Sequence, residues 1–174
     1  FRFLDGIHGE TDYIGLQYYS RICPRHVFDG TGNLEDADFG EGMSDLHWPI
    51  YSQGLYRVVQ DNWQRYGKPI MITENGLADA ADTRRARFIH DHLGWLHRSL
   101  REGVDVRGYY HWATTDNFEW KHGFWPRFGL VEVDYDTLER TVRPSARSYE
   151  RICRSGEVVL PADHPSLAQG AVQR

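Results

Sequence analysis

The sequence predicts an α/β fold with a parallel sheet. Three short runs, at 12–19, 70–73 and 106–112, have the length and the β-prone or apolar composition of buried strands. Two segments with apolar residues at helical spacing, 52–67 and 82–103, separate these runs. Strands that alternate with helices of this length are typical of βαβ units, in which helices cover a parallel sheet.

The first strand, Asp12–Tyr19, is followed by a loop rich in Gly, Asp and Pro that extends to about Pro49. The first helix is expected to begin at Ser52, because serine is a frequent N-cap, and to end before Gly67. The residues at helical spacing in this segment are Leu55, Val58, Val59 and Trp63.

The second strand, Ile70–Thr73, is a continuous apolar run, as expected of a strand that is covered on both faces. The second helix is expected to begin near Asp82-Thr83 and to stop at Gly103, with Ile89, Leu93, Leu96 and Leu100 on one face. The third strand, Val106–Trp112, follows it directly.

The last part of the chain has a different pattern. Leu130–Tyr135 alternates apolar and polar residues and is expected to pair with Arg140–Val142 as a β-hairpin. Pro144 is expected to open a last helix at its favoured first-turn position, and this helix runs to Gly156. Residues 1–159 are therefore expected to form one domain, and residues 160–174, which lack an apolar period, a disordered tail.

The composition narrows the class of protein. The 174 residues are 40% hydrophobic and 26% charged, as in a globular chain with a sizeable core. The net charge of -5, without a basic stripe, argues against nucleic acid as a partner. No stretch approaches the roughly 18 consecutive apolar residues that cross a bilayer, and the first residues lack the pattern of a signal peptide. We expect no membrane partner and a cytoplasmic location.

Glu74 directly follows a buried strand, at the edge of the sheet where the loops of barrels build active sites. A carboxylate held there is suited to attack an anomeric carbon and to form a covalent glycosyl intermediate. The structural alternative is a glutamate that caps the next helix or pairs with an arginine. Spacing alone leaves both interpretations open.

A second polar and aromatic segment, Trp112–Trp120, follows the third strand, so we expect it at the neighbouring rim. Trp112 and Trp120 offer flat faces and indole N–H donors, and Glu119 can accept hydrogen bonds from two vicinal hydroxyls. This combination suits a polyol. The alternative is a structural loop in which Asp116 and Asn117 form caps or turns.

Several motifs, taken together and in order, resemble glycoside hydrolase family 1, the β-glucosidase and β-glycosidase group. They are Asp12-Tyr13-Ile14-Gly15-Leu16-Gln17-Tyr18-Tyr19-Ser20, Tyr66-Gly67-Lys68-Pro69-Ile70-Met71-Ile72-Thr73-Glu74-Asn75-Gly76, Gly108-Tyr109-Tyr110-His111-Trp112, Asp116-Asn117-Phe118-Glu119-Trp120, Arg127-Phe128-Gly129-Leu130-Val131-Glu132-Val133-Asp134-Tyr135 and Arg143-Pro144-Ser145-Ala146. The resemblance covers most of residues 10–155. It implies a partial (β/α)8 barrel, made of the last three or so β/α units, a β-hairpin and a C-terminal helix.

The resemblance also implies a role for individual residues and a substrate, a β-glycoside or oligosaccharide. Glu74 resembles the nucleophile, and Tyr19 resembles the tyrosine whose hydroxyl bonds to it. Four residues resemble the sugar-binding groups: Trp112 the platform, Glu119 the acceptor for distal hydroxyls, Trp120 an indole donor, and Phe128 an aromatic wall. We expect no cofactor.

Three positions bear on the substrate, and one position bears on the nucleophile. Family members that cleave 6-phosphoglycosides carry Ser, Lys and Tyr at the positions of Glu119, Pro126 and Phe128, where phosphate needs donors and positive charge. This chain has none of the three, which implies an unphosphorylated glycone. Gln17 stands where the family usually has Asn, and its extra methylene would shift the amide by roughly an ångström near Glu74.

A retaining glycosidase needs two carboxyl groups roughly 5 Å apart. In this family the acid/base glutamate lies in a Thr-x-Asn-Glu-Pro motif upstream of everything present here, and no Asn-Glu-Pro occurs in the sequence. Because a closed barrel needs eight strands and typically about 250 residues, we expect a truncated or split protein, inactive alone, which an N-terminal barrel fragment completes. The alternative is a non-catalytic, sugar-binding half-barrel.

Other site types have little support. A metal site through His90, His92 and His97 is disfavoured, because His90 and His97 lie two turns apart and His92 points elsewhere. These histidines are expected to be solvated or locally hydrogen-bonded. His111 is a candidate for the pocket rim without an assigned role. Cys23 and Cys153 lack the spacing of a disulfide framework or zinc site.

Overall fold

The computed structural model describes residues 2–21 and 41–167. Most of the expected loop before Pro49, with Cys23, and the last seven residues of the expected tail lie outside the described residues. The elements are α1 (Arg2–Ile7), η1 (His8–Glu10), β1 (Ile14–Tyr18), α3 (Ser52–Tyr66), β2 (Ile70–Asn75), α4 (Arg85–Arg101), β3 (Val106–His111), η2 (Trp120–His122), β4 (Val131–Val133), β5 (Arg140–Val142), α5 (Pro144–Ser155) and η3 (Pro165–Leu167).

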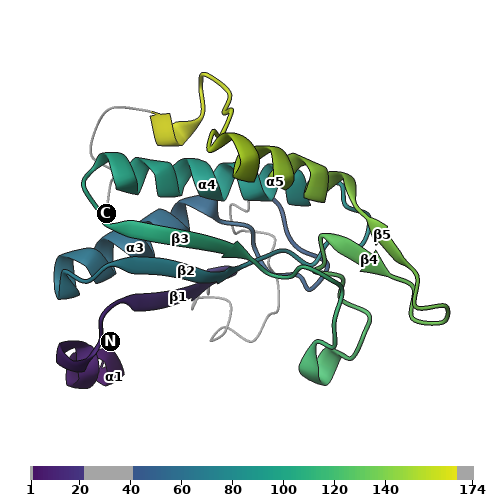
Figure 1. Ribbon diagram of the computed structural model, residues 1–174, viewed down its shortest axis with the longest axis horizontal. Helices are drawn as coiled ribbons and strands as arrows, with labels where there is room; N and C mark the ends of the chain where they lie inside the picture. The colour runs from purple at the N-terminus through teal and green to yellow at the C-terminus, as the bar shows by residue number, and fades with distance from the viewer. Residues whose placement is uncertain (1, 22–40, 168–174) are drawn as a thin grey trace, which may run out of the picture.

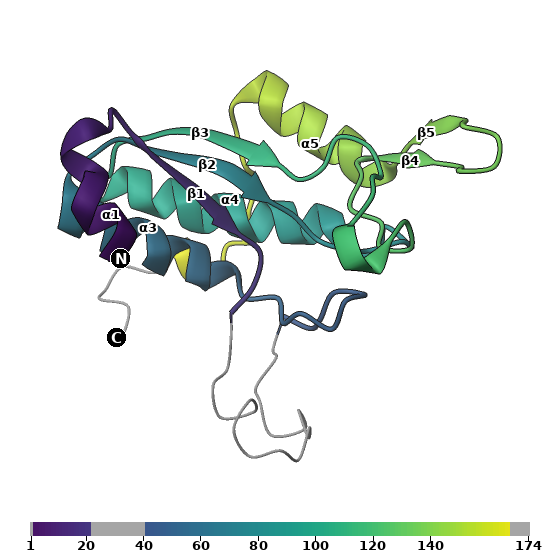
Figure 2. The same cartoon turned by 90° about the horizontal axis from the view of Figure 1, so that it is seen from below.

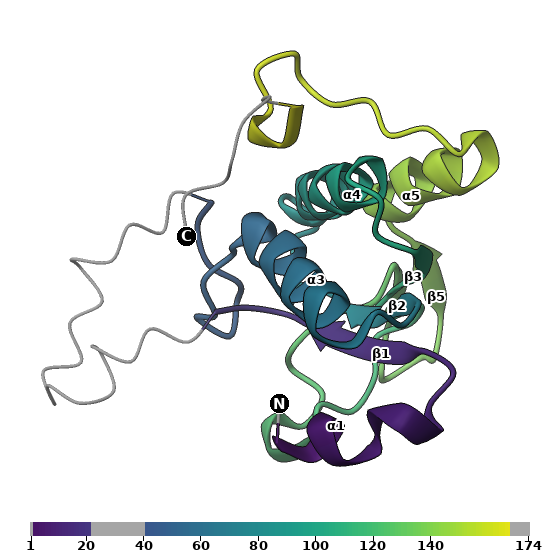
Figure 3. The same cartoon turned by 90° about the vertical axis from the view of Figure 1, so that its left-hand side faces the viewer.

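The strands β1, β2 and β3 form a parallel sheet in that order (Figure 1). The register pairs Ile14 with Ile70 and Ile72 with Tyr109. The connecting helices α3 and α4 lie on the same face of the sheet, as the view along the strands in Figure 3 shows. This is the arrangement of βαβ units that the alternating pattern predicts.

The core lies between this sheet and its helices. Leu55 and Val59 of α3 pack against Ile70 and Ile72 of β2, and all four side chains are fully buried. Truncation of a buried leucine or isoleucine to alanine costs about 2–5 kcal/mol. The central strand is therefore held firmly along the part that leads to Glu74.

The N-terminus of α3 differs from the sequence prediction. Ser52 is the first helical residue rather than the cap, and Tyr51 at the cap position makes no side-chain cap bond. The Ser52 N–H instead donates to both carboxylate oxygens of Glu41, at 2.9 and 3.1 Å. Glu41, which lies outside the helix, thus supplies the hydrogen-bond acceptor for the start of α3.

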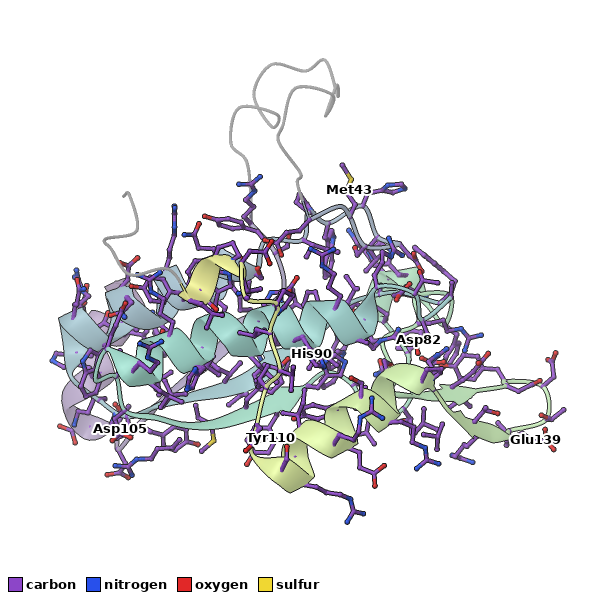
Figure 4. The ribbon with its side chains drawn as sticks, turned by 90° about the horizontal axis from the view of Figure 1, so that it is seen from above. Met43, Asp82, His90, Asp105, Tyr110 and Glu139 are labelled. Carbon is purple, nitrogen blue, oxygen red and sulfur yellow. The ribbon has the colours of Figure 1, made fainter. Side chains whose placement is uncertain are left out.

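The start of α4 also differs, since it begins at Arg85 rather than near Asp82-Thr83. The buried Asp79 carboxylate accepts hydrogen bonds from the backbone N–H groups of Arg84 at 2.8 Å and Arg85 at 3.0 Å. It thereby satisfies N–H donors that have no partner within the first turn of the helix. Asp82 faces α5 instead, where it accepts the Ser145 N–H at 2.9 Å and the Ser145 hydroxyl at 2.6 Å. Figure 4 shows Asp82 beside the beginning of α5.

The expected hairpin and last helix are present. β4 and β5 are antiparallel, and Val131 pairs with Val142. α5 begins at Pro144, ends before Gly156 and packs on α4 through Tyr149 and Ile152. The hairpin extends away from the sheet, as Figure 2 shows.

Residues 160–167, the described part of the segment expected as a tail, lie against α4. His164 and Ser166 are buried, and the His164 Nε2 lies 3.4 Å from Asp91 of α4. Gly94 of α4 permits this contact, because a Cβ there would lie 2.7 Å from Leu160 and 3.1 Å from the Ser166 hydroxyl. This segment lacks the apolar period that marks an α-helix. The short 3-10 helix η3 makes its contact with α4 instead. Across residues 2–21 and 41–167, no helix is long and apolar enough to cross a membrane.

We predict that Gly54→Ala destabilises the protein although alanine is the better helix former by about 0.5–1 kcal/mol. The new Cβ of α3 would lie 1.9 Å from the Tyr18 hydroxyl, which donates to the Tyr51 carbonyl at 2.7 Å. We expect the free energy of unfolding, measured in urea, to fall by about 1–3 kcal/mol. Gly94→Ala is the control and should cost less, because its Cβ meets only flexible side-chain ends. Equal effects would contradict the argument.

Candidate active site

Glu74 lies near the carboxyl end of β2, and both of its carboxylate oxygens are hydrogen-bonded. The Gln17 Nε2 donates to Oε1 at 2.7 Å, and the Tyr19 hydroxyl donates to Oε2 at 2.6 Å. Gln17 is the register partner of Glu74 on β1, so the parallel pairing of the strands brings these groups together. The carboxylate is held in one orientation, and the Tyr19 bond that the resemblance implies is present.

Tyr19 remains a hydrogen-bond donor over the ordinary pH range. Burial raises the pKa of its hydroxyl well above the usual value, and the bond to the Glu74 carboxylate raises this pKa further. The negative charges of Glu74 and Glu119 act in the same direction. A phenol that stays protonated can only donate toward an ionised Glu74.

Asn75 fixes the strand end that carries Glu74. Its fully buried side chain donates to the Tyr18 carbonyl at 2.7 Å and accepts the Tyr109 hydroxyl at 2.8 Å. Its own carbonyl accepts the Trp112 N–H at 2.9 Å. One residue therefore links β1, β2 and β3 at their carboxyl ends.

Gly76 brings Trp112 close to Glu74. A Cβ on Gly76 would lie 1.9 Å from the Trp112 carbonyl oxygen, so no larger residue fits without displacing that backbone. The Trp112–Ala113 peptide bond is cis. Trp112 is half-buried and packs beside Ala78, Ala113 and Phe128. The structure thus places the expected platform residue next to the strand that carries Glu74.

Phe128, which the resemblance implies as an aromatic wall of the sugar site, is buried beside Tyr19. Its side chain is only 2% exposed and packs edge-on against Tyr19, with ring centroids 6.1 Å apart. Trp48 contacts both rings, at 6.1 Å from Tyr19 and 6.3 Å from Phe128. Phe128 and Trp48 therefore restrict the position of the Tyr19 ring. Sequence reasoning missed Trp48, because nothing in its local pattern distinguishes it from other loop residues.

The loop between β3 and β4, which lies beyond the carboxyl ends of the strands in Figure 1, is held by a buried ion pair. Asp116 accepts two bonds from the Arg143 guanidinium, at 3.0 and 3.1 Å. It also accepts the Gly129 N–H at 2.8 Å, and both charged side chains are at most 4% exposed. Asp116 is thus neither a cap nor a simple turn residue, and Arg143 is a partner that the sequence did not indicate.

The same loop carries Glu119, which is half-buried, and Trp120, which extends into solvent. Burial raises the pKa of the half-buried Glu119 carboxyl, and the charge of Glu74 raises it as well, while His122 opposes the shift. The Trp120 side chain is 79% exposed.

His90, His92 and His97 have different surroundings. Among the described residues no group of three or more His, Cys, Asp or Glu could hold a metal ion. His92 is buried, its Nδ1–H donates to the Phe88 carbonyl at 2.8 Å, and burial lowers its pKa to about 4. His90 lies between α4 and α5 (Figure 4), where its Nε2 is 3.0 Å from the Ser148 hydroxyl. His97 is exposed.

His111 is half-buried, and both of its ring nitrogens are shielded from solvent. Its ring packs against Tyr149 of α5, with centroids 6.1 Å apart. Burial and the charge of Arg85 lower its pKa to about 3, so it is neutral at ordinary pH. His111 therefore belongs to the contact between the sheet and its helices.

Comparison with known proteins gives one consistent family. The family model described as glycosyl hydrolase family 1 matches residues 3–158. The chain is 43% identical to a β-galactosidase from Sulfolobus acidocaldarius over 155 residues, which are 89% of this chain and 30% of that protein. It is 38% identical to β-glucosidase A from Acetivibrio thermocellus over 122 residues, which are 64% of this chain and 27% of that protein.

Solved structures agree with these sequence matches. A hyperthermophilic β-glucosidase from Pyrococcus furiosus matches with a TM-score of 0.80 and 36% identity, over 97% of this chain and 38% of that chain. Fpglu1 from Fervidobacterium matches with a TM-score of 0.77 and 31% identity, over 90% and 38%. The chain therefore spans about a third of the length of the proteins it matches.

We predict that Asp116→Asn lowers the free energy of unfolding by about 3–5 kcal/mol, because it leaves the buried Arg143 charge with only the exposed Glu132 carboxylate, 3.9 Å away, as a counter-charge among the described residues. Urea denaturation measures the change, and adding Arg143→Met should recover part of it. The control is Asp134→Asn, since Asp134 lies in an exposed turn where its carboxylate accepts two backbone N–H groups. A loss no larger than that of the control would show that the ion pair does not hold the loop.

Proposed function

Because the chain belongs to glycosyl hydrolase family 1, we propose that Glu74 is the nucleophile of a β-glycosidase that hydrolyses O-glycosidic bonds with retention of configuration. The observation that carries the proposal is the pair of hydrogen bonds from Gln17 and Tyr19, which hold both oxygens of Glu74 at the carboxyl end of β2. A nucleophile needs this fixed orientation beneath the sugar ring.

The reaction has two steps. Glu74 attacks the anomeric carbon, the bond to the leaving oxygen breaks, and a general acid gives that oxygen a proton. In the second step the residue that served as the general acid acts as a base. It takes a proton from water as the water attacks the anomeric carbon and releases Glu74. Gln17 and Tyr19 orient the Glu74 carboxylate before attack, and the carboxylate that the second step releases returns to the same two donors.

The proposed sugar site lies between Glu74 and the loop after β3. Trp112 offers a face to the ring, and Glu119 accepts hydrogen bonds from two hydroxyls. The exposed Trp120 can donate its indole N–H to a third hydroxyl. The family resemblance places the phosphate-binding residues of 6-phosphoglycosidases at Glu119, Pro126 and Phe128, which supply no positive charge here. An unphosphorylated β-glucoside or β-galactoside is the proposed substrate.

The proposed acid/base residue is not part of this sequence. No Asn-Glu-Pro motif occurs in the 174 residues, and the chain corresponds to about a third of its relatives. We propose that an N-terminal barrel segment supplies this glutamate and the remaining sugar-binding groups. The same observation favours a second candidate, a sugar-binding protein without catalysis.

Covalent labelling distinguishes the two candidates. A 2-deoxy-2-fluoro-β-glucoside with a dinitrophenolate leaving group needs little acid assistance, so a competent Glu74 forms a stable ester with it. We expect mass spectrometry to find one fluoroglucosyl group per chain, on the peptide that contains Glu74. Glu74→Gln is the matched control and should remain unlabelled. If the wild-type chain binds sugars and yet forms no adduct on Glu74, the non-catalytic candidate stands.

We predict that Tyr19→Phe slows this labelling about ten- to hundred-fold, because the Glu74 carboxylate loses one charge-assisted hydrogen bond. The labelling rate at saturating reagent measures the effect. Tyr18→Phe is the control, since the Tyr18 hydroxyl donates to the Tyr51 carbonyl and not to Glu74. This control should lower stability without slowing the labelling. A Tyr19→Phe chain that reacts at the wild-type rate would mean that Gln17 alone holds the nucleophile.

A further inference from the structure

The turn formed by residues 43–49 carries Trp48 and is closed by its own hydrogen bonds. Met43 and Pro49 form an antiparallel bridge across it. The Ser44 N–H donates to the Trp48 carbonyl at 2.9 Å, and the Trp48 N–H donates to the Ser44 hydroxyl at 3.1 Å. Trp48 therefore has a fixed place within the turn, so the position of its ring depends on how the turn is attached to the rest of the protein.

Asp45 attaches this turn to the segment that follows β2. The Asp45 N–H donates to the Ala78 carbonyl at 2.9 Å, and one carboxylate oxygen accepts the Ala80 N–H at 2.7 Å. The other carboxylate oxygen is paired with the guanidinium of Arg84, the residue directly before α4. Arg84 also donates to the carbonyl of Met43, where the turn begins. The turn is thus fixed to the connection between β2 and α4.

The other side of the turn reaches the proposed active site. The Trp48 ring packs on Tyr19, with centroids 6.1 Å and planes 75° apart. The Tyr19 hydroxyl donates to the Glu74 carboxylate at 2.6 Å, and Glu74 belongs to β2. A closed path of contacts therefore runs from the segment after β2 through Asp45, Trp48 and Tyr19 back to β2.

We propose that Asp45 is a positioning residue for the nucleophile, because it fixes Trp48 against the Tyr19 ring and so holds the Tyr19 hydroxyl on Glu74. The inference rests on the proposed function, which makes Glu74 the nucleophile. The Asp45 and Arg84 side chains are 28% and 38% exposed, so their charge attraction alone adds little stability. The contribution of Asp45 is geometric, since a carboxylate with a separate partner on each oxygen has one orientation. Small displacements near reacting atoms change rates strongly.

The first measurement uses the full chain and needs no chemical step. The Tyr19 ring lies beside the rings of Trp48 and Phe128, whose ring currents displace its proton NMR signals. We expect Asp45→Ala to move these signals towards those of an unstacked tyrosine, and Trp48→Leu sets the limit of this change. Asp45→Asn keeps an acceptor for Ala80 but loses the charge that faces Arg84, so it should move them less, in the same direction.

The matched control is Asp105→Ala. Asp105 also pairs with an arginine, Arg107 at 2.9 Å, but it directly precedes β3 at the amino end of the sheet. This control should leave the Tyr19 signals unchanged. Unchanged Tyr19 signals in folded Asp45→Ala and Asp45→Asn would overturn the inference.

The second measurement is the rate at which the fluoroglucoside labels Glu74 at saturating reagent. Asp45→Ala should slow the labelling about three- to ten-fold, as a partial loss of the Tyr19 bond requires. Adding Asp45→Ala to Tyr19→Phe should slow it no further, because the hydroxyl that Asp45 positions is already absent. Independent, multiplying effects in the double variant would also overturn the inference. A wild-type chain without label contradicts only the catalytic proposal, and the Tyr19 signals then decide the role of Asp45.

Discussion

The geometry of the site depends on one buried amide, the side chain of Asn75. Its donor satisfies a β1 carbonyl and its acceptor satisfies the Tyr109 hydroxyl of β3, with no exposure to solvent. A buried amide that lost these partners would cost about 1–3 kcal/mol for each unpaired group. Other registers of the three strands are therefore disfavoured. Because successive side chains of a strand point to opposite faces, fixing Asn75 also fixes the direction of Glu74.

The second constraint acts on the loop that follows β3. Burying Asp116 and Arg143 is expensive, and the pair is tolerated because further donors and acceptors complete its hydrogen bonds. Asp116 accepts the Gly129 N–H, and Arg143 donates to the Gly129 carbonyl at 2.8 Å. An ion pair of this kind adds little net stability, but it permits only one path for the loop. That path determines where Trp112 and Glu119 lie relative to Glu74.

The sequence predicts the elements well and their ends less well. The strand at Ile70 and the helix at Pro144 are marked by local composition and by proline, so both are found where expected. The caps of α3 and α4 come from Glu41 and Asp79, which lie outside each helix, and no local pattern marks them. The contact of residues 160–167 with α4 is likewise not marked by a local pattern, because it depends on the space beside Gly94 of α4.

Some site residues can be predicted from the sequence, and others cannot. The position of Glu74 at the end of a buried strand is visible in the sequence, because it follows from the order of elements. The burial of Phe128 and the contact of Trp48 with Tyr19 depend on packing between distant segments, which a single sequence does not encode locally. Family resemblance names a residue type at a position, but it does not say whether that side chain faces the ligand or supports one that does.

The two carboxylates of the proposed site differ in their hydrogen bonds, and this difference suits different tasks. Glu74 is held by two neutral donors, which orient the carboxylate without cancelling its charge, as attack on an anomeric carbon requires. Donors bound to Glu119 in the same way would compete with the hydroxyls it is proposed to accept. A direct ion pair with an arginine, such as the pair that holds Asp116, would also occupy the lone pairs of Glu119. A glutamate that is to accept sugar hydroxyls is therefore better left without such a partner.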